Sequence, residues 1–151
     1  MRRLTRRTRC ERGFSLIELL VVILVIGILA AIAIPMFLGK RNNAEDADAQ
    51  SNARNLATEV ESCFTPNQDF TECQTQADLD GGDGLLWGSG PGQVEVVSAQ
   101  KNSYVITAVS KAKSGGVNHT FTITRQIGGD STLTCTAGPT DTGGGCKGGT
   151  W

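Results

Sequence analysis

The sequence has little of what metal and redox chemistry need. It contains one histidine in 151 residues, and none of its five cysteines forms a Cys-x-x-Cys pair. Zinc sites are normally built from several such ligands, and thiol redox centres from closely spaced cysteine pairs. The single histidine, His119, lies in a segment of strand-like composition without a positioned nucleophile or base as its partner. We therefore expect a protein that is not an enzyme.

Charged residues are absent from one long stretch, Leu19 to Leu38, which is apolar almost throughout. At a rise of ~1.5 Å per residue, about 20 helical residues cross the ~30 Å hydrocarbon core of a bilayer. Six arginines precede this stretch, with one glutamate among them, whereas Lys40 and Arg41 follow it. Because basic flanks stay in the cytoplasm, the sequence predicts a single-pass membrane anchor with a cytoplasmic N-terminus.

Basic side chains are scarce in the rest of the chain. From Phe14 onward there are 8 lysine and arginine residues against 14 aspartate and glutamate residues, a formal charge of −6. Such an acidic portion lacks the positive surface that nucleic-acid binding requires, so we expect no nucleic-acid partner. The same portion holds most of the 19 glycines and few aromatic residues, which is typical of a small, turn-rich domain.

The cysteines divide in the same way. Cys10 lies in the basic N-terminal segment, while Cys63, Cys73, Cys135 and Cys146 lie in the acidic portion. An even number of cysteines in a small exported domain predicts two disulfides, for which three pairings are possible. We favour Cys63 with Cys73 and Cys135 with Cys146 because each pair closes a short loop, although the sequence does not decide between the pairings.

One long helix is expected from Phe14 to about Phe64. Its first part is apolar on every side, and the pattern changes after Lys40. From there apolar residues recur at spacings of three and four, which places them on one stripe, while Asp46 and Asp48 are among the polar residues between them. The stripe consists of Ala49, Ala53, Leu56, Val60 and Phe64.

The partner of this stripe is predicted to be a β-sheet. Four short segments rich in Val, Ile, Thr and aromatic residues follow at turn spacing, at residues 93–98, 103–109, 119–125 and 132–136. Phe121 and Ile123 alternate with threonines, as in a strand with one wet face. The sequence thus predicts an α+β fold, in which an antiparallel sheet of about four strands covers the helix stripe.

An acidic loop lies between helix and sheet, within a loop-like stretch from Pro66 to Gly92. Asp78, Asp80 and Asp83 could offer oxygen ligands to Ca²⁺, although their spacing matches no EF-hand. The alternative is a solvated acidic loop. We expect no cofactor, with calcium as the open alternative at these three aspartates.

A junction of unlike residues joins the arginine-rich segment to the apolar stretch. It consists of Arg12, Gly13, Phe14 and Ser15, followed by Glu18. The stretch RGFSLIELLVVILVIGILAAIAIP, residues 12–35, resembles the N-terminal signature of type IV prepilins and of the related pseudopilins of type II secretion. A basic leader, a Gly–Phe junction and an acid four residues further on coincide in it.

This resemblance implies processing and assembly. In that family a membrane-bound prepilin peptidase cuts after the glycine and methylates the new amine, so the scissile bond would join Gly13 to Phe14 and Phe14 would become N-methylphenylalanine. The glycine and proline usual in the family's helix fall at Gly27 and Pro35. The resemblance implies that the helix melts locally there on entering a filament, and the alternative at Pro35 is a simple kink in the membrane helix. Further implied partners are other copies of the chain in a helical filament and a pilus or secretion assembly platform.

Glu18 is an ionisable group inside a membrane-spanning stretch, which makes it a candidate functional residue. Its natural partner is the amine at Phe14, which lies ~6 Å along a helix, on the same subunit or on a neighbour. Ser15-x-x-Glu18 also fits a capping box, in which both residues satisfy amides at the start of the helix. Both roles remain open, and the two can coexist.

Two other interpretations concern cleavage. Ala31-Ile32-Ala33 resembles a signal-peptidase site, which would make everything before Ile34 an ordinary export signal. That interpretation places Glu18 inside an apolar region longer than the usual ~7–15 residues. Cys10 precedes the apolar stretch, so it is no lipobox cysteine and would be discarded with the leader.

The sequence thus predicts three parts. A basic leader at 1–13 is followed by a helix at 14–64, whose residues 14–38 anchor and assemble the subunit. Residues 65–151 form a globular α+β head together with the distal half of the helix. The predicted function is that of a structural subunit of a type IV pilus-like filament, first in the bacterial inner membrane and then on the cell surface. The alternatives are a pseudopilin or minor pilin of a type II secretion or competence machine, and an anchored surface module that does not polymerise.

Overall fold

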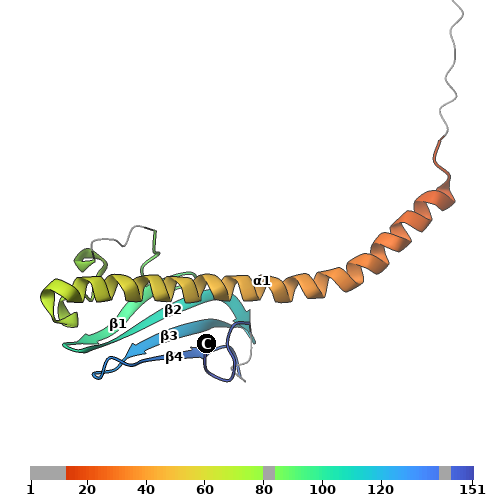
Figure 1. Cartoon of the computed structure of the whole chain (residues 1–151). Helices are drawn as coiled ribbons and strands as arrows, with labels where there is room; N and C mark the ends of the chain where they lie inside the picture. The colour runs from red at the N-terminus through yellow and green to blue at the C-terminus, as the bar shows by residue number, and fades with distance from the viewer. Residues whose placement is uncertain (1–12, 80–83, 140–143) are drawn as a thin grey trace, which may run out of the picture. The chain divides into compact units, whose positions relative to one another are not determined.

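The computed structural model describes residues 13–79, 84–139 and 144–151, apart from the side chains of Pro35 and Leu38. Its described elements are one long helix, two short 3₁₀ helices and a four-stranded sheet (Figure 1). In chain order they are α1 (Leu16–Asn67), η1 (Phe70–Glu72), η2 (Gln76–Asp78), β1 (Val94–Gln100), β2 (Ser103–Ser114), β3 (Val117–Arg125) and β4 (Ser131–Thr136). The predicted α+β class, with one helix and four antiparallel strands, is confirmed.

The chain consists of two compact units, with the boundary between Phe37 and Leu38. In the first, the helical residues from Leu16 to Phe37 expose apolar side chains on every side; Leu20, for example, is 48% exposed and Leu16 80%. This part of α1 is long and apolar enough to cross a membrane. Exposing so much contiguous apolar surface to water is unfavourable, so we expect lipid or protein to surround this unit.

Helix α1 is 52 residues long and ends one turn beyond the predicted end at Phe64. The amide of Gln68 donates to the carbonyl of Phe64, and Gln68 has a positive φ of 54°. This is a left-handed C-cap, which stops a helix by satisfying one of its last carbonyls. Pro66 precedes the cap without breaking the last turn.

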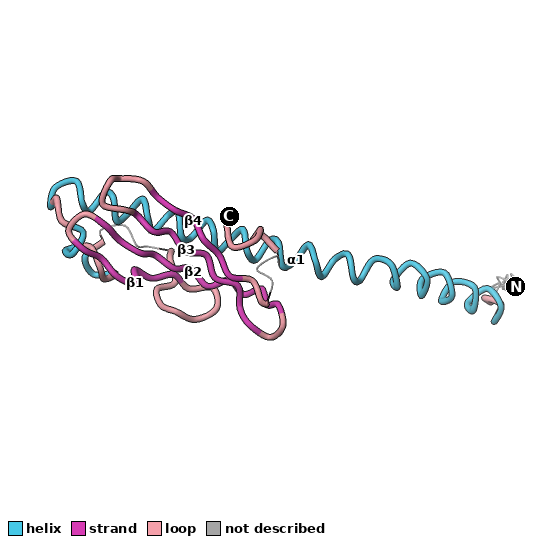
Figure 2. The backbone as a smooth tube through the Cα atoms, turned by 90° about the horizontal axis from the view of Figure 1, so that it is seen from below, coloured by secondary structure: helices cyan, strands magenta, loops and turns pink. Residues whose placement is uncertain are grey.

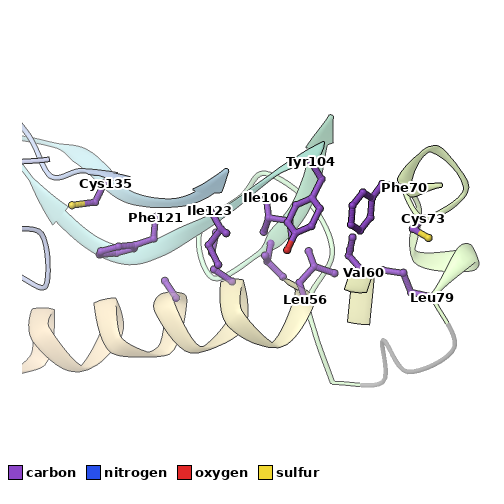
Figure 3. Close-up of a cluster of buried hydrophobic side chains, with 14 of the residues drawn as sticks. Leu56, Val60, Phe70, Cys73, Leu79, Tyr104, Ile106, Phe121, Ile123 and Cys135 are labelled. Carbon is purple, nitrogen blue, oxygen red and sulfur yellow. The ribbon is translucent and has the colours of Figure 1, made fainter. Parts of the chain in front are cut away.

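The second unit packs the distal part of α1 along one face of the sheet (Figures 1 and 2). The predicted stripe is buried at Ala49, Ala53, Leu56 and Val60, each no more than 3% exposed. These side chains belong to one core with the inward-facing residues of the strands, and Figure 3 shows Leu56 and Val60 in that core. The central sheet partners are Ile106, Ala108, Phe121 and Ile123. Phe64, the last stripe residue, stacks on Phe70 with ring centroids 4.1 Å apart.

The sheet has the order β1-β2-β3-β4, with antiparallel neighbours throughout. Strand β2 runs five residues past the predicted end at Val109. It turns into β3 through Gly115 and Gly116, whose φ values of 61° and 85° suit the two central positions of a tight hairpin turn. A bulge interrupts β1 between Val96 and Ser98.

Both outer strands carry further pairings. Val94 at the start of β1 forms an isolated parallel bridge with Trp87, and Thr134 in β4 forms an antiparallel one with Thr150. Between α1 and β1, the stretch predicted as a loop holds η1 and η2. Phe70 in η1 is fully buried, which attaches this connection to the core.

Disulfides join Cys63 to Cys73 and Cys135 to Cys146, the pairing favoured from the sequence. The first ties the end of α1 to η1. The second ties β4 to the C-terminal segment. Both close loops of about ten residues, and Cys73, Cys135 and Cys146 are buried.

Removing either disulfide should lower the free energy of unfolding of the second unit by about 2–4 kcal/mol, because each restricts the unfolded chain. We expect Cys63→Ser/Cys73→Ser and Cys135→Ser/Cys146→Ser each to melt at a lower temperature than wild type, while Cys10→Ser leaves the melting curve unchanged. Peptide mapping of the exported protein without reductant checks the pairing. Recovery of free thiols at any of the four positions would contradict it.

Candidate functional site

The predicted processing junction lies directly before α1, and the described residues leave it exposed. Gly13 and Phe14 precede the helix, and Phe14 is 83% exposed. A Cβ placed on Gly13 would meet no atom within 4 Å. Among the described residues, none obstructs the close approach of a peptidase to this bond. The cleavage and the methylation of Phe14 stay predictions.

Glu18 lies in the first turn of α1, where its carboxylate faces the start of the helix. Its Oε2 accepts a long hydrogen bond of 3.4 Å from the amide of Ser15, and the carbonyl of Ser15 accepts the amides of Glu18 and Leu19. Ser15 thus stands at the N-cap position, and Glu18 makes half of a capping box. This long hydrogen bond leaves the carboxylate able to take a cationic partner as well.

Gly27 and Pro35 both lie within α1, which continues past them to Asn67. The missing side chain at Gly27 leaves a shallow apolar groove on this helix, lined also by Leu20, Ile23, Leu24, Ile28 and Ala31. Small residues four apart, here Gly27 and Ala31, let two helices approach closely inside a membrane. The expected local melting between Gly27 and Pro35 belongs to the assembled state and stays a prediction.

A polar cluster of the buried Asp46 and His119 with the partly buried Ser114 and Gly145 lies in the second unit. His119 Nδ1 is 2.9 Å from Asp46 Oδ2, and His119 Nε2 is 2.7 Å from Ser114 Oγ. The amide of Gly145 donates to Asp46 Oδ2 at 2.8 Å. Asp46 and His119 are fully buried. The expectation that His119 has no positioned partner is therefore wrong, because the distant helix α1 supplies Asp46 and the neighbouring strand β2 supplies Ser114.

This cluster fastens the C-terminal segment to the helix. A side chain at Gly144 would overlap the Asp46 carboxylate, and Gly144 has a φ of 60°, which glycine adopts without strain. Gln50, one turn after Asp46, donates to the carbonyl of Gly145 at 3.4 Å. The segment that ends in the Cys135–Cys146 disulfide is thus held by α1 as well as by β4.

Comparison with known proteins gives two kinds of match. The family described as the prokaryotic N-terminal methylation motif matches residues 8–34. A fimbrial protein of Pseudomonas aeruginosa is 31% identical over 132 residues, which cover 84% of this chain and 86% of that protein. The chain belongs to the type IV pilin family.

Other pilins agree with this assignment. The type IV narrow pilus major component PilA5 of Thermus thermophilus is 30% identical over 107 residues, which cover 68% of this chain and 92% of that protein. The type II secretion system core protein G of Escherichia coli is 41% identical, but over only 46 residues, or 30% of this chain. The similarity to the pilins thus extends into the head, whereas the match to the secretion protein is short.

The polar cluster of this pilin has the order Asp–His–Ser that some hydrolases use, but it is enclosed. With its proton on Nδ1, His119 donates to Asp46 and accepts the hydroxyl proton of Ser114, so each buried group has a partner. An outside molecule does not reach the fully buried imidazole. The cluster is a structural joint between α1, β2, β3 and the C-terminal segment.

Two features of the sequence indicate this joint, although the prediction above did not include it. Asp46 lies three residues before Ala49 and seven before Ala53, so it continues the apolar stripe instead of facing solvent. His119 has the same phase in β3 as the inward residues Phe121 and Ile123. An acid in line with a buried stripe and a histidine in line with a buried strand face indicate a buried pair.

A second cluster of interacting polar side chains in the pilin head consists of Glu61, Tyr104 and Arg125. Glu61 of α1 accepts from the hydroxyl of Tyr104 at 3.1 Å and pairs with Arg125 at 2.7 Å. Burial, and then the nearby Glu61 carboxylate, raises the pKa of Tyr104, so this phenol keeps its proton.

The candidate calcium ligands are only partly described. Asp78 accepts from the hydroxyl and the amide of Thr75 at 2.7 and 2.9 Å, and these hydrogen bonds lower the pKa of its carboxyl. Asp80 and Asp83 lie outside the described residues. Within the described ranges, no three histidine, cysteine or acidic side chains gather closely enough to hold a metal ion. Calcium binding stays a prediction.

Proposed function

We propose that this chain is the structural subunit of a type IV pilus-like extracellular filament and assembles through the first part of α1. The observation that carries the proposal is the solvent-exposed helix from Leu16 to Phe37, which is apolar apart from Glu18, on a chain whose similarity to a fimbrial protein covers 86% of that protein. In the precursor this helix lies in the bacterial inner membrane, with the N-terminus in the cytoplasm. In the filament, helices of neighbouring copies replace the lipid.

Packing and charge drive this exchange more than hydrophobic transfer does, because lipid is already apolar. The groove at Gly27 offers a site of close approach for a neighbouring helix. The amine of a processed Phe14 offers Glu18 a charge partner on the next subunit. A prepilin peptidase and an assembly platform are the further partners of this route.

Processing is tested at Gly13. Replacing Gly13 with Leu should leave an uncut precursor in the membrane, because a bulky side chain blocks the close approach that glycine permits. Intact-mass analysis should find wild-type mature protein starting at a methylated Phe14, and the variant still carrying residues 1–13. The control is Gly39→Leu, at another open glycine in α1, which should be cut normally. Mature wild-type protein starting at Ile34 or Met1 would contradict the proposal.

A pseudopilin or minor pilin is the second candidate function, and the match to the Escherichia coli secretion protein favours it. The two candidate functions share the N-terminal helix. They differ in how much of the filament this chain makes up. Electron microscopy of sheared filaments, with mass spectrometry of their main subunit, separates them. Filaments built mainly from this chain support the pilin, and filaments with only traces of it support the second candidate.

A further inference from the structure

The sheet face turned away from α1 carries a regular array of small uncharged polar side chains. Alternate residues are buried from Tyr104 to Ala112 in β2 and from His119 to Ile123 in β3, Cys135 is buried in β4, and the residues between them are partly or fully exposed. Threonine is the commonest residue at these outward positions, which also hold Val105 and Val109. Two cross-strand pairs show that they share one surface: Thr107 Oγ1 lies 3.1 Å from Thr122 Oγ1, and Thr120 Oγ1 lies 2.6 Å from Thr136 Oγ1.

A hollow of about 120 Å³ lies at the end of this face. The strand register brings its outward residues together, since Ser98 pairs with Val105, Val105 with Thr124, and Gln100 with Ser103. Gln126 follows directly after β3 and completes the rim. Hydroxyls and amides both donate and accept hydrogen bonds, so the residues that line the hollow offer donors and acceptors close together.

At this end of the face the strands carry no charged side chain outward, and the exposed Lys101 and Asp130, which have opposite signs, lie in the turns beyond the strands. Arg125 also borders the hollow, but its guanidinium pairs with Glu61 of α1 and lies 5.5 Å from the centroid of the Phe70 ring, on the helix side. Among the outward positions of the described strands, charged side chains occur at Glu95, near the start of β1, and at Lys111 and Lys113, near the far end of β2. A neutral surface of donors and acceptors complements a neutral ligand with the same groups.

We infer that this outward face binds an uncharged polysaccharide, with the hollow between Ser98, Gln100, Thr124 and Gln126 taking one sugar unit and the threonine array its neighbours along the chain. Sugar hydroxyls match the hydroxyls and amides of this surface in size and in hydrogen-bonding capacity. One copy of such a polar, shallow site binds weakly. Repetition along a filament, which rests on the proposed function, raises the overall strength by multivalency.

The test measures retention of sheared filaments on three uncharged supports, cellulose, chitin and cross-linked dextran, and on anionic alginate gel. We expect retention on at least one uncharged support, unchanged by added salt, and little on alginate. Gln100→Ala/Gln126→Ala should reduce this retention by about tenfold or more, because several hydrogen bonds per subunit are lost at every repeat. The matched control Gln76→Ala, an exposed glutamine in η2, should bind as wild type does.

Failure to bind any uncharged support, or equal retention of Gln100→Ala/Gln126→Ala and wild type, would overturn the inference. So would stronger, salt-sensitive binding to alginate. Electron microscopy of each preparation keeps this outcome separate from the proposed function. If wild type forms no filaments, the proposed function fails, and the detergent-solubilised full chain is then coupled densely to beads and tested with cellulose oligosaccharides under the same criteria.

Discussion

Glu18→Gln yields a subunit that is inserted and cleaved but stays in the membrane. The change keeps an oxygen that can accept the amide of Ser15, so a capping role survives. It removes the charge that would pair with the Phe14 amine of a neighbouring subunit in a filament core of low dielectric constant. Breaking a buried ion pair from one side costs about 3–5 kcal/mol, which is enough to favour the membrane-stored monomer.

The measurement is the amount of subunit in sheared filaments relative to mature protein retained in the membrane. Because each 1.4 kcal/mol is a factor of ten, the Gln variant should lose filament by about a hundredfold or more. Glu45→Gln, the same chemical change at a helix residue paired with Arg41, should assemble normally. Wild-type filament yield from Glu18→Gln would leave capping as the sole role of this residue.

Asp46→Ala destabilises the head more than any single change at its surface. It leaves the buried Nδ1–H of His119 and the partly buried amide of Gly145 without their acceptor. Loss of one partner from a buried pair costs about 3–5 kcal/mol, which lowers the melting temperature of a domain this size by on the order of 10–20 °C.

Thermal unfolding of the detergent-solubilised pilin checks this expectation. Asp48→Ala removes an exposed carboxylate two residues along the same helix and should shift stability by only about 0.5 kcal/mol. Adding His119→Ala to Asp46→Ala should cost less than the two single changes together, because the residues share one interaction. Equal melting temperatures for Asp46→Ala and Asp48→Ala would show that the joint contributes little.

Local patterns were enough to predict most of this fold. The apolar stretch, the stripe from Ala49 to Val60 and the alternation at Phe121 and Ile123 each lie within one element, where spacing alone fixes which face is buried. The two disulfides were favoured correctly because each closes a short loop.

The missed features depend on contacts between distant segments. Asp46 and Gly145 are 99 residues apart, and Asp46 and His119 are 73 apart. A polar residue on a stripe has a solvent-facing and a buried interpretation, and only its tertiary partner decides between them. The end of α1 was missed for a related reason, since the cap at Gln68 uses a residue type with no strong preference for that conformation.

Both edge strands of the sheet, β1 and β4, carry features that hinder pairing with a further strand. Exposed strand edges pair with one another and cause chains to aggregate, a hazard that grows where many copies lie side by side. Here the bulge at Val96–Ser98 breaks the regular edge of β1, and the bridge from Thr134 to Thr150 occupies part of the edge of β4. Both features disfavour sheet extension between neighbouring heads in the proposed filament, which would leave the order of the polymer to the helices.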